Sequence, residues 1–437
     1  MCIRQQSAVI LVLAAALGSA LPSQAGPRGA MSVYQYQPPP QSPVRLRPGG
    51  GRRPGRNGQP GQPGRNGQPG RNGAAKQYLT QQLFQAVQAN NLTAVQTLLG
   101  QGADANAKDA SGETALIQAV LSGNVEMVNL LLSHGAGINI PDIAGHTPLM
   151  AAAKYEGSDM LAPLLAKGAA VNSRDTGGYT ALILAAGAGK DENIPLLLGK
   201  QAEVNAKTKE GYTALMVAAG TGNAPIAKML LGKGADPKAV DILDNTVLMA
   251  SAQAGDAVTA RLLIAAGVDV NAADKEGYTA LILAARAGKA NLVDLLMDNS
   301  ADLKPKNKDG YTAFLMAVRG GSVPAASALL DKGADLKETD GVGDGALIHA
   351  SKYDRPEMVS LLLGKGLEIN AVNGAGETAL ITAAKSDCPG VVSLLLTKGA
   401  DAAVKDASGS TAAMWASTMG YPDIVKLLPM PGAPARG

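Results

Sequence analysis

The sequence predicts an all-α solenoid of stacked helix–turn–helix units behind a disordered arm. The heptapeptide KEGYTAL occurs at residues 209–215 and again at 275–281, so its two copies start 66 residues apart. Hydrophobic residues make up 46% of the chain but aromatic residues only 3%, which indicates packing layers of small side chains such as alanine and leucine. Many thin, similar layers, rather than one large core, are typical of a repeat protein.

Residues 1–25 have the pattern of a secretory signal peptide. Arg4 provides a positive start, and the run from Ser7 to Leu21 is almost wholly apolar. At 15 residues this run is short for a membrane span, which needs about 20. Small residues lead up to Ala25, so we predict cleavage after it. We therefore expect a secreted or periplasmic protein with no transmembrane anchor; retention of the leader as an uncleaved anchor is the alternative.

Residues 26–75 are interpreted as a disordered linker rich in proline, glycine and arginine. Residues 1–75 hold nine arginines and no lysine, aspartate or glutamate, which leaves 30 basic and 36 acidic residues, a net charge of −6, in 76–437. A Gly-X-Y period runs through 55–73, as a collagen-like trimerising stem would require. Because this low-complexity tract has few prolines, we favour a flexible basic linker. An arm that tethers or oligomerises an envelope-associated structural protein is the alternative.

A threonine in the pattern G-x-T-A-L sets the period of the remaining chain. The anchors are 33 residues apart, at Thr114, Thr147, Thr180, Thr213, Thr246, Thr279, Thr312, Gly345 in place of threonine, Thr378 and Thr411. A divergent unit at 76–108 keeps the leucine register and is expected to cap the N-terminal end. We therefore expect about eleven units over 76–431 and a tail at 432–437. Gly345 lacks the threonine hydroxyl, which predicts local weakness around 338–357.

Residues 274–306 show how one unit is built. Thr279 is placed to accept hydrogen bonds from the first turn of a short helix over 280–287. Gly288 stands where a helix ends in a left-handed residue, and a second helix is expected over 291–298. Helices of about two turns cannot persist alone in water, so each unit depends on stacking against its neighbours.

The units resemble ankyrin repeats. The resemblance rests on the 33-residue period, the T-x-L of the first helix and the later L-L-x-x-G-A-D-x-N, and it covers about 76–428. Gln201 and Ser300 depart from the pattern by replacing the turn glycine, and Asp354 and Asp387 by replacing the mid-unit glycine. The resemblance implies a solenoid with short β-hairpin-like turns that acts as a binding module.

No motif for catalysis or for a cofactor is found. The sequence lacks HExxH, GxSxG, a phosphate-binding loop and paired cysteine ligands. The three histidines, His134, His146 and His349, fall in different units at different positions, so we interpret them as surface or turn residues rather than metal ligands. Cys388 is interpreted as a structural thiol. We therefore expect a protein that is not an enzyme and that needs no cofactor or metal.

Residues at one phase of the repeat are expected to line up as columns along the solenoid. The residue directly before each anchor forms the pre-cap column: Glu113, His146, Tyr179, Tyr212, Asn245, Tyr278, Tyr311, Asp344, Glu377 and Ser410. Tyrosine is favoured at interfaces for its large area and polar tip. The resemblance places this column on the partner-contacting surface, so we predict partner binding by its four tyrosines. Packing of the rings on adjacent turns is the alternative.

The residue seven positions after each anchor forms a second column, the helix-end column. Four consecutive units carry a cation there: Arg286, Arg319, Lys352 and Lys385. A cation at a helix end is favourable because it meets the helix dipole, but that effect does not require four in succession. We therefore predict that these side chains bind an anionic partner in the inner groove that the resemblance implies.

These features predict a monomeric, non-catalytic scaffold that binds another protein, one with an acidic patch, through its groove and turn face. A nucleic acid is not an expected partner, because the body is net acidic and few aromatic residues accompany the cations.

Overall fold

The computed structural model describes residues 71–429, and side chains from residue 76 onward. The helices follow one another in pairs. The first helices of the pairs are α2 (Arg71–Gln88), α4 (Ala115–Leu121), α6 (Pro148–Tyr155), α8 (Ala181–Gly187), α10 (Ala214–Gly220), α12 (Val247–Ala254), α14 (Ala280–Arg286), α16 (Ala313–Gly320), α18 (Ala346–Lys352), α20 (Ala379–Lys385) and α22 (Ala412–Met419). The second helices are α3 (Leu92–Gly100), α5 (Val125–Ser133), α7 (Ser158–Ala166), α9 (Asn193–Gly199), α11 (Ala224–Gly232), α13 (Ala257–Ala265), α15 (Ala290–Asp298), α17 (Val323–Asp331), α19 (Pro356–Gly364), α21 (Pro389–Thr397) and α23 (Pro422–Leu427).

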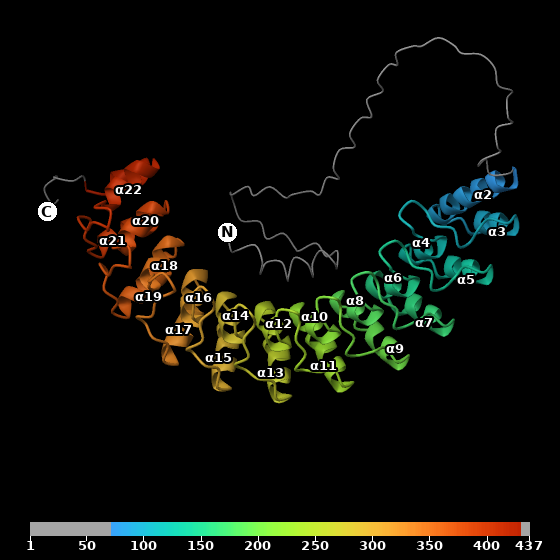
Figure 1. Ribbon diagram of the computed structural model, residues 1–437, viewed down its shortest axis with the longest axis horizontal. Coiled ribbons are helices and arrows are strands. Elements are labelled where there is room, and N and C mark those ends of the chain that lie inside the picture. The colour runs from blue at the N-terminus through green and yellow to red at the C-terminus, as the bar shows by residue number, and fades with distance from the viewer. Residues whose placement is uncertain (1–70, 430–437) are drawn as a thin grey trace, which may run out of the picture.

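The helix pairs stack side by side into a crescent (Figure 1). First helices pack on first helices, as α10 does on α12, and second helices on second helices, as α15 does on α17. The first helices lie on the inner side of the crescent and the second helices on the outer side. The predicted helical solenoid is confirmed. Helix α2 begins within the range interpreted as linker, while the leader, the rest of the linker and the tail lie outside the described residues.

The core is one continuous layer because every first helix lies between its neighbours. In α14 the whole stretch 280–285 is buried, whereas α15 buries mainly one face, through residues such as Leu292 and Leu296. The helices predicted over 280–287 and 291–298 match α14 and α15 to within one residue at each end. Neither helix has enough length to be stable alone, so their stability comes from this burial.

Threonine begins the first helices as the sequence predicts. At each threonine anchor from Thr114 to Thr411 the hydroxyl accepts a hydrogen bond from the backbone N–H three residues later. Gly345 begins α18 without any side-chain cap. The predicted weakness around 338–357 stays a prediction, now with a missing hydrogen bond as its cause.

The positions where glycine is replaced keep the backbone conformation that glycine favours. The mid-unit Gly288 has φ +69°, and Asp354 and Asp387 at the same phase have φ +53° and +54°. Gln201 and Ser300 likewise have φ +61° and +65° in the turn. A left-handed conformation costs free energy for a residue with a Cβ, so the fold imposes it against local preference.

An asparagine eight residues before the anchor joins one repeat to the next. The Nδ2 of Asn205 donates to the carbonyl of Gly234 at 3.1 Å, and its Oδ1 accepts from the N–H of Asp236 at 2.8 Å. Both hydrogen bonds recur with the same spacing at three further repeats: Asn106, Asn172 and Asn271. These two hydrogen bonds give partners to a backbone C=O and a backbone N–H of the turn that neither helix can reach.

The hairpin-like turn before each first helix is held by the side chain five residues before the anchor. In most repeats this residue is an aspartate, whose Oδ1 accepts from the N–H groups two and four residues later, as Asp340 does from Val342 and Asp344. Five of these turns also form an isolated antiparallel bridge, such as Val240 with Thr246. The partner of the second carboxylate oxygen, Oδ2, differs from one repeat to the next.

His146 uses two of these aspartates to join adjacent turns. Its Nδ1 lies 3.2 Å from Oδ2 of Asp142 in its own turn, and its Nε2 lies 3.4 Å from Oδ2 of Asp175 in the next turn. The carboxylate of Asp175, with a smaller contribution from Asp142, raises the pKa of His146 above its ordinary value. The protonated ring therefore links two repeats.

Polar side chains mark the N-terminal end of the described chain, and an extended segment marks its C-terminal end. Gln77, Gln81, Gln85 and Gln88 are exposed along α2, and Gln82 is half-buried. At the other end α23 is followed by an extended Leu428 and by proline. A polar outer face allows the terminal repeats to meet water.

Among residues 71–429, no helix combines the length and the apolar character needed to cross a membrane.

Replacing Asn205 tests the joint between repeats. Asn205→Ala removes two hydrogen bonds, each worth about 0.5–1.5 kcal/mol, so we expect a lower denaturation midpoint and faster hydrogen exchange at the amide of Asp236. Lys238→Ala is the matched control, because Lys238 occupies the same phase of the next repeat, where no such side-chain pair forms. Equal effects of the two substitutions would contradict the assigned role.

Replacing His146 tests the pH dependence of the same joint. Because its folded-state pKa lies above the unfolded value of about 6.5, its stabilising contribution is complete below that pH and is lost as the pH rises through the folded-state pKa. His146→Gln should therefore lower the melting temperature more at pH 5.5 than at pH 8.5. His134→Gln is the control, since His134 forms no ion pair within 71–429. A pH-independent difference would refute the link.

Candidate functional site

The structure places the four predicted tyrosines in a sheltered position on the inner side. Tyr179, Tyr212, Tyr278 and Tyr311 are only 8–9% exposed, each directly before the threonine that begins an inner helix. Burial raises the pKa of Tyr212 to about 12 and also raises the pKa values of Tyr179 and Tyr311. The rings therefore stay neutral and present little area to a partner. Partner binding by these four tyrosines stays a prediction.

The two predicted columns contact each other. The guanidinium carbon of Arg286 lies 5.5 Å from the ring centroid of Tyr278, and that of Arg319 lies 5.2 Å from the ring centroid of Tyr311. The contact arises because a residue before the helix and a residue at its end, eight positions apart, lie on the same side of a two-turn helix. Tyrosine thus supports the arginine of its own repeat by a cation–π contact.

The two lysines of the helix-end column meet carboxylates of the pre-cap column instead. Nζ of Lys352 lies 3.7 Å from Oδ2 of Asp344, and Lys385 forms an ion pair with Glu377. Their charges are therefore compensated inside the array. Of the four predicted cations, only the two arginines face uncharged rings in their own repeats.

Two aromatic residues that the sequence did not single out also contact cations of the helix-end column, each from the following repeat. The guanidinium of Arg319 also lies 4.9 Å from the ring centroid of Tyr353, and Nζ of Lys385 lies 4.3 Å from the ring centroid of Trp415. Burial lowers the pKa of Arg286, although arginine keeps its charge at neutral pH. The inner side thus carries cations whose positions are fixed by aromatic faces.

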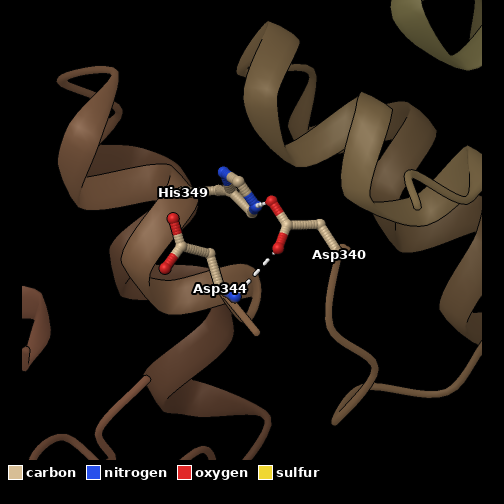
Figure 2. A group of neighbouring side chains, drawn as sticks. All are labelled: Asp340, Asp344 and His349. Carbon is tan, nitrogen blue, oxygen red and sulfur yellow. Dashed lines mark hydrogen bonds and ion pairs between the residues drawn. The ribbon is translucent and has the colours of Figure 1, made fainter. Parts of the chain in front are cut away.

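A second group of side chains lies beside Arg319, in the repeat whose anchor is Gly345. His349, from the middle of α18, is completely buried, so its interpretation as a surface or turn residue is wrong. Asp340 and Asp344 from the preceding turn are 9% and 5% exposed. Figure 2 shows the imidazole of His349 turned toward the carboxylate of Asp340, with the side chain of Asp344 beside them.

The polar atoms of this group are not fully paired. Nε2 of His349 lies 3.1 Å from Oδ2 of Asp340, yet neither ring nitrogen makes a hydrogen bond of suitable geometry within the described residues. Burial lowers the pKa of His349, against the opposite effect of the two aspartates. The ring is flanked by Tyr311 at 5.2 Å and Tyr353 at 6.3 Å between centroids.

The signal for this group is a polar residue at the fourth position of a first helix. Apolar residues fill that position in most repeats, but Gln118, His349, Thr382 and Trp415 have a polar group there, and the hydroxyl of Thr382 donates to the carbonyl of Thr378 within its own helix. Nε2 of Gln118 donates to Oδ2 of Asp109 at 2.9 Å, and Nε1 of Trp415 donates to Oδ2 of Asp406 at 2.6 Å. In these pairs the helix residue follows the turn aspartate by nine positions. This spacing predicts the pair only once the geometry of the turn is known.

Cys388 is buried, and burial raises the pKa of its thiol to about 11. The thiol is therefore protonated and unreactive at neutral pH, which supports the structural role expected from the sequence.

The sequence matches the model of a known protein family. The family model described as ankyrin repeats (3 copies) matches residues 83–175, 156–241, 238–307, 287–373 and 347–434. Among solved structures, the crystal structure of the human ASB11 ankyrin repeat domain is similar at 24% identity and a TM-score of 0.46, over 51% of this chain and 100% of that one. No curated protein matches. Because the family matches together span most of the sequence, the chain belongs to the ankyrin-repeat family.

Proposed function

We propose that this protein is a non-catalytic scaffold that binds another protein on the inner side of its crescent, outside the cytoplasm. Ankyrin repeats support a role in protein–protein interaction. The leader, with cleavage after Ala25, is the basis for the secreted or periplasmic location, and the spacing of the anchors is the basis for about eleven repeats. The observation that carries the binding site is the pair of arginine–tyrosine contacts in consecutive repeats.

Arg286 and Arg319 are the centre of the proposed contact. They face tyrosine rings, whereas Lys352 and Lys385 are ion-paired with carboxylates of their own repeats. A planar guanidinium can donate two parallel hydrogen bonds to a carboxylate, which suits an acidic segment of a partner. Tyr278 and Tyr311 hold the two arginines in place, so less side-chain entropy is lost when a partner binds. Tyr179 and Tyr212 would contribute through the edges of their rings.

The test is capture of a partner by variants of the two arginines. We expect the double substitution Arg286→Gln and Arg319→Gln to lower recovery of the partner by about tenfold or more, because each lost charge-assisted hydrogen bond is worth about 1.5–3 kcal/mol. Recovery is measured by quantitative mass spectrometry after capture from the native extracellular or periplasmic fraction. Binding to the unchanged protein should also weaken at high salt.

Arg261→Gln is the matched control, because Arg261 is exposed on α13, on the outer side. The control should capture as much partner as the unchanged protein, and thermal melts should show that all three chains are folded. Equal capture by the double variant would refute the inner arginines as the contact, and parallel loss with Arg261→Gln would indicate a general charge effect instead.

A further inference from the structure

The group of Asp340, Asp344 and His349 combines three potential ligand atoms in one buried place. One atom from each residue lies within 4.8 Å of the others. Nε2 of His349 and Oδ2 of Asp340 are only 3.1 Å apart. A tetrahedral metal ion with bonds of about 2.0–2.2 Å keeps its ligand atoms roughly 3.3–3.6 Å apart, so only a small adjustment separates this arrangement from a coordination shell.

Hydrogen bonds hold one oxygen of each carboxylate, which leaves Oδ2 of Asp340, and Oδ2 of Asp344 beside the Nζ of Lys352, as ligand atoms. Oδ1 of Asp340 accepts two backbone N–H groups, from Val342 and Asp344, so Oδ2 faces His349. Oδ1 of Asp344 accepts from Nδ2 of Asn373 in the next repeat at 2.7 Å. Hydrogen bonds of this kind orient metal ligands and increase affinity.

The charge of the group is incompletely balanced by the protein. Two buried carboxylates face one cation, Lys352, whose Nζ is 3.7 Å from Asp344 and whose side chain is 45% exposed. Unbalanced buried charge is costly, and a divalent cation would remove that cost. Burial of His349 without a hydrogen-bond partner leaves a nitrogen lone pair that a metal ion could use.

The other repeats show that this arrangement is not simply how the fold satisfies its turn aspartate. Gln118 and Trp415 occupy the position of His349 and donate well-formed hydrogen bonds to Asp109 and Asp406. His146 also lies between two aspartates, but both of its nitrogens have a carboxylate partner and its side chain is 41% exposed. Only the His349 group, among residues 71–429, has three ligands that fit a metal ion.

We propose that Asp340, Asp344 and His349 bind one Zn²⁺ ion. Magnesium and calcium prefer six or more oxygen ligands, whereas zinc accepts a mixture of imidazole and carboxylate in a four-coordinate shell. The three side chains supply three positions, and a water molecule completes the tetrahedron. The ion ties the turn to α18, whose N-cap Gly345 makes no side-chain hydrogen bond, and it thereby replaces a lost local restraint.

The experiment titrates metal-free full-length protein with Zn²⁺ by calorimetry and repeats the titration with Co²⁺ while the visible spectrum is recorded. We expect one site that is lost in His349→Leu, a Co²⁺ spectrum typical of tetrahedral coordination, and slower hydrogen exchange over 338–357 when Zn²⁺ is bound. Asp344→Asn should weaken binding by more than about 100-fold, since even a residue that only orients a ligand contributes about 10–100-fold.

His146→Gln is the matched control and should leave the zinc site unchanged. Asp344→Asn keeps the size of the side chain, so it tests the site even if His349→Leu fails to fold. Absence of Zn²⁺ binding, an unchanged site in Asp344→Asn, or loss of the site in His146→Gln would each overturn the proposal. An altered exchange pattern confined to repeats away from 338–357 would do the same.

Discussion

Stacking of each repeat on the next is the constraint on which the whole structure depends. Apart from α2, the helices span about two turns, and the inner ones are buried by the first helices of both neighbouring repeats as well as by the second helix of their own repeat. Apolar burial supplies the driving force, while the Asn205 type of pairing and the turn aspartates satisfy the backbone groups between repeats. No repeat can therefore be understood apart from its neighbours.

Stacking also turns sequence phase into spatial adjacency. Nζ of Lys207 donates to the carbonyl of Val240, 33 positions later, and Lys306 donates to Thr339 in the same way. The same rule places Tyr353 beside Arg319, so a cation is shared between its own repeat and the next one. Arg319 is thus held from two repeats, which restrains its side chain more than contacts within one repeat would.

Three departures from the repeat pattern fall in one repeat. The repeat anchored at Gly345 lacks the threonine cap, carries histidine in place of an aliphatic residue and holds Asp354 in a left-handed conformation. Each change costs stability when considered alone. His349 packs near Tyr311 and Tyr353, the two rings that Arg319 also contacts, so this group and the arginine–tyrosine contacts are neighbours.

The sequence by itself determined the period, the helix boundaries of the unit at 274–306 to within a residue, the threonine caps and the left-handed conformation of Gly288, because these depend on interactions within a few residues of the chain. It also identified the two columns. Only the tertiary structure decided how the columns are used: the tyrosines are sheltered, the arginines lie on them, and the lysines are neutralised by Asp344 and Glu377. It likewise decided that His349 is buried beside two carboxylates, since burial and pairing depend on the side chains that neighbouring repeats bring to the same place.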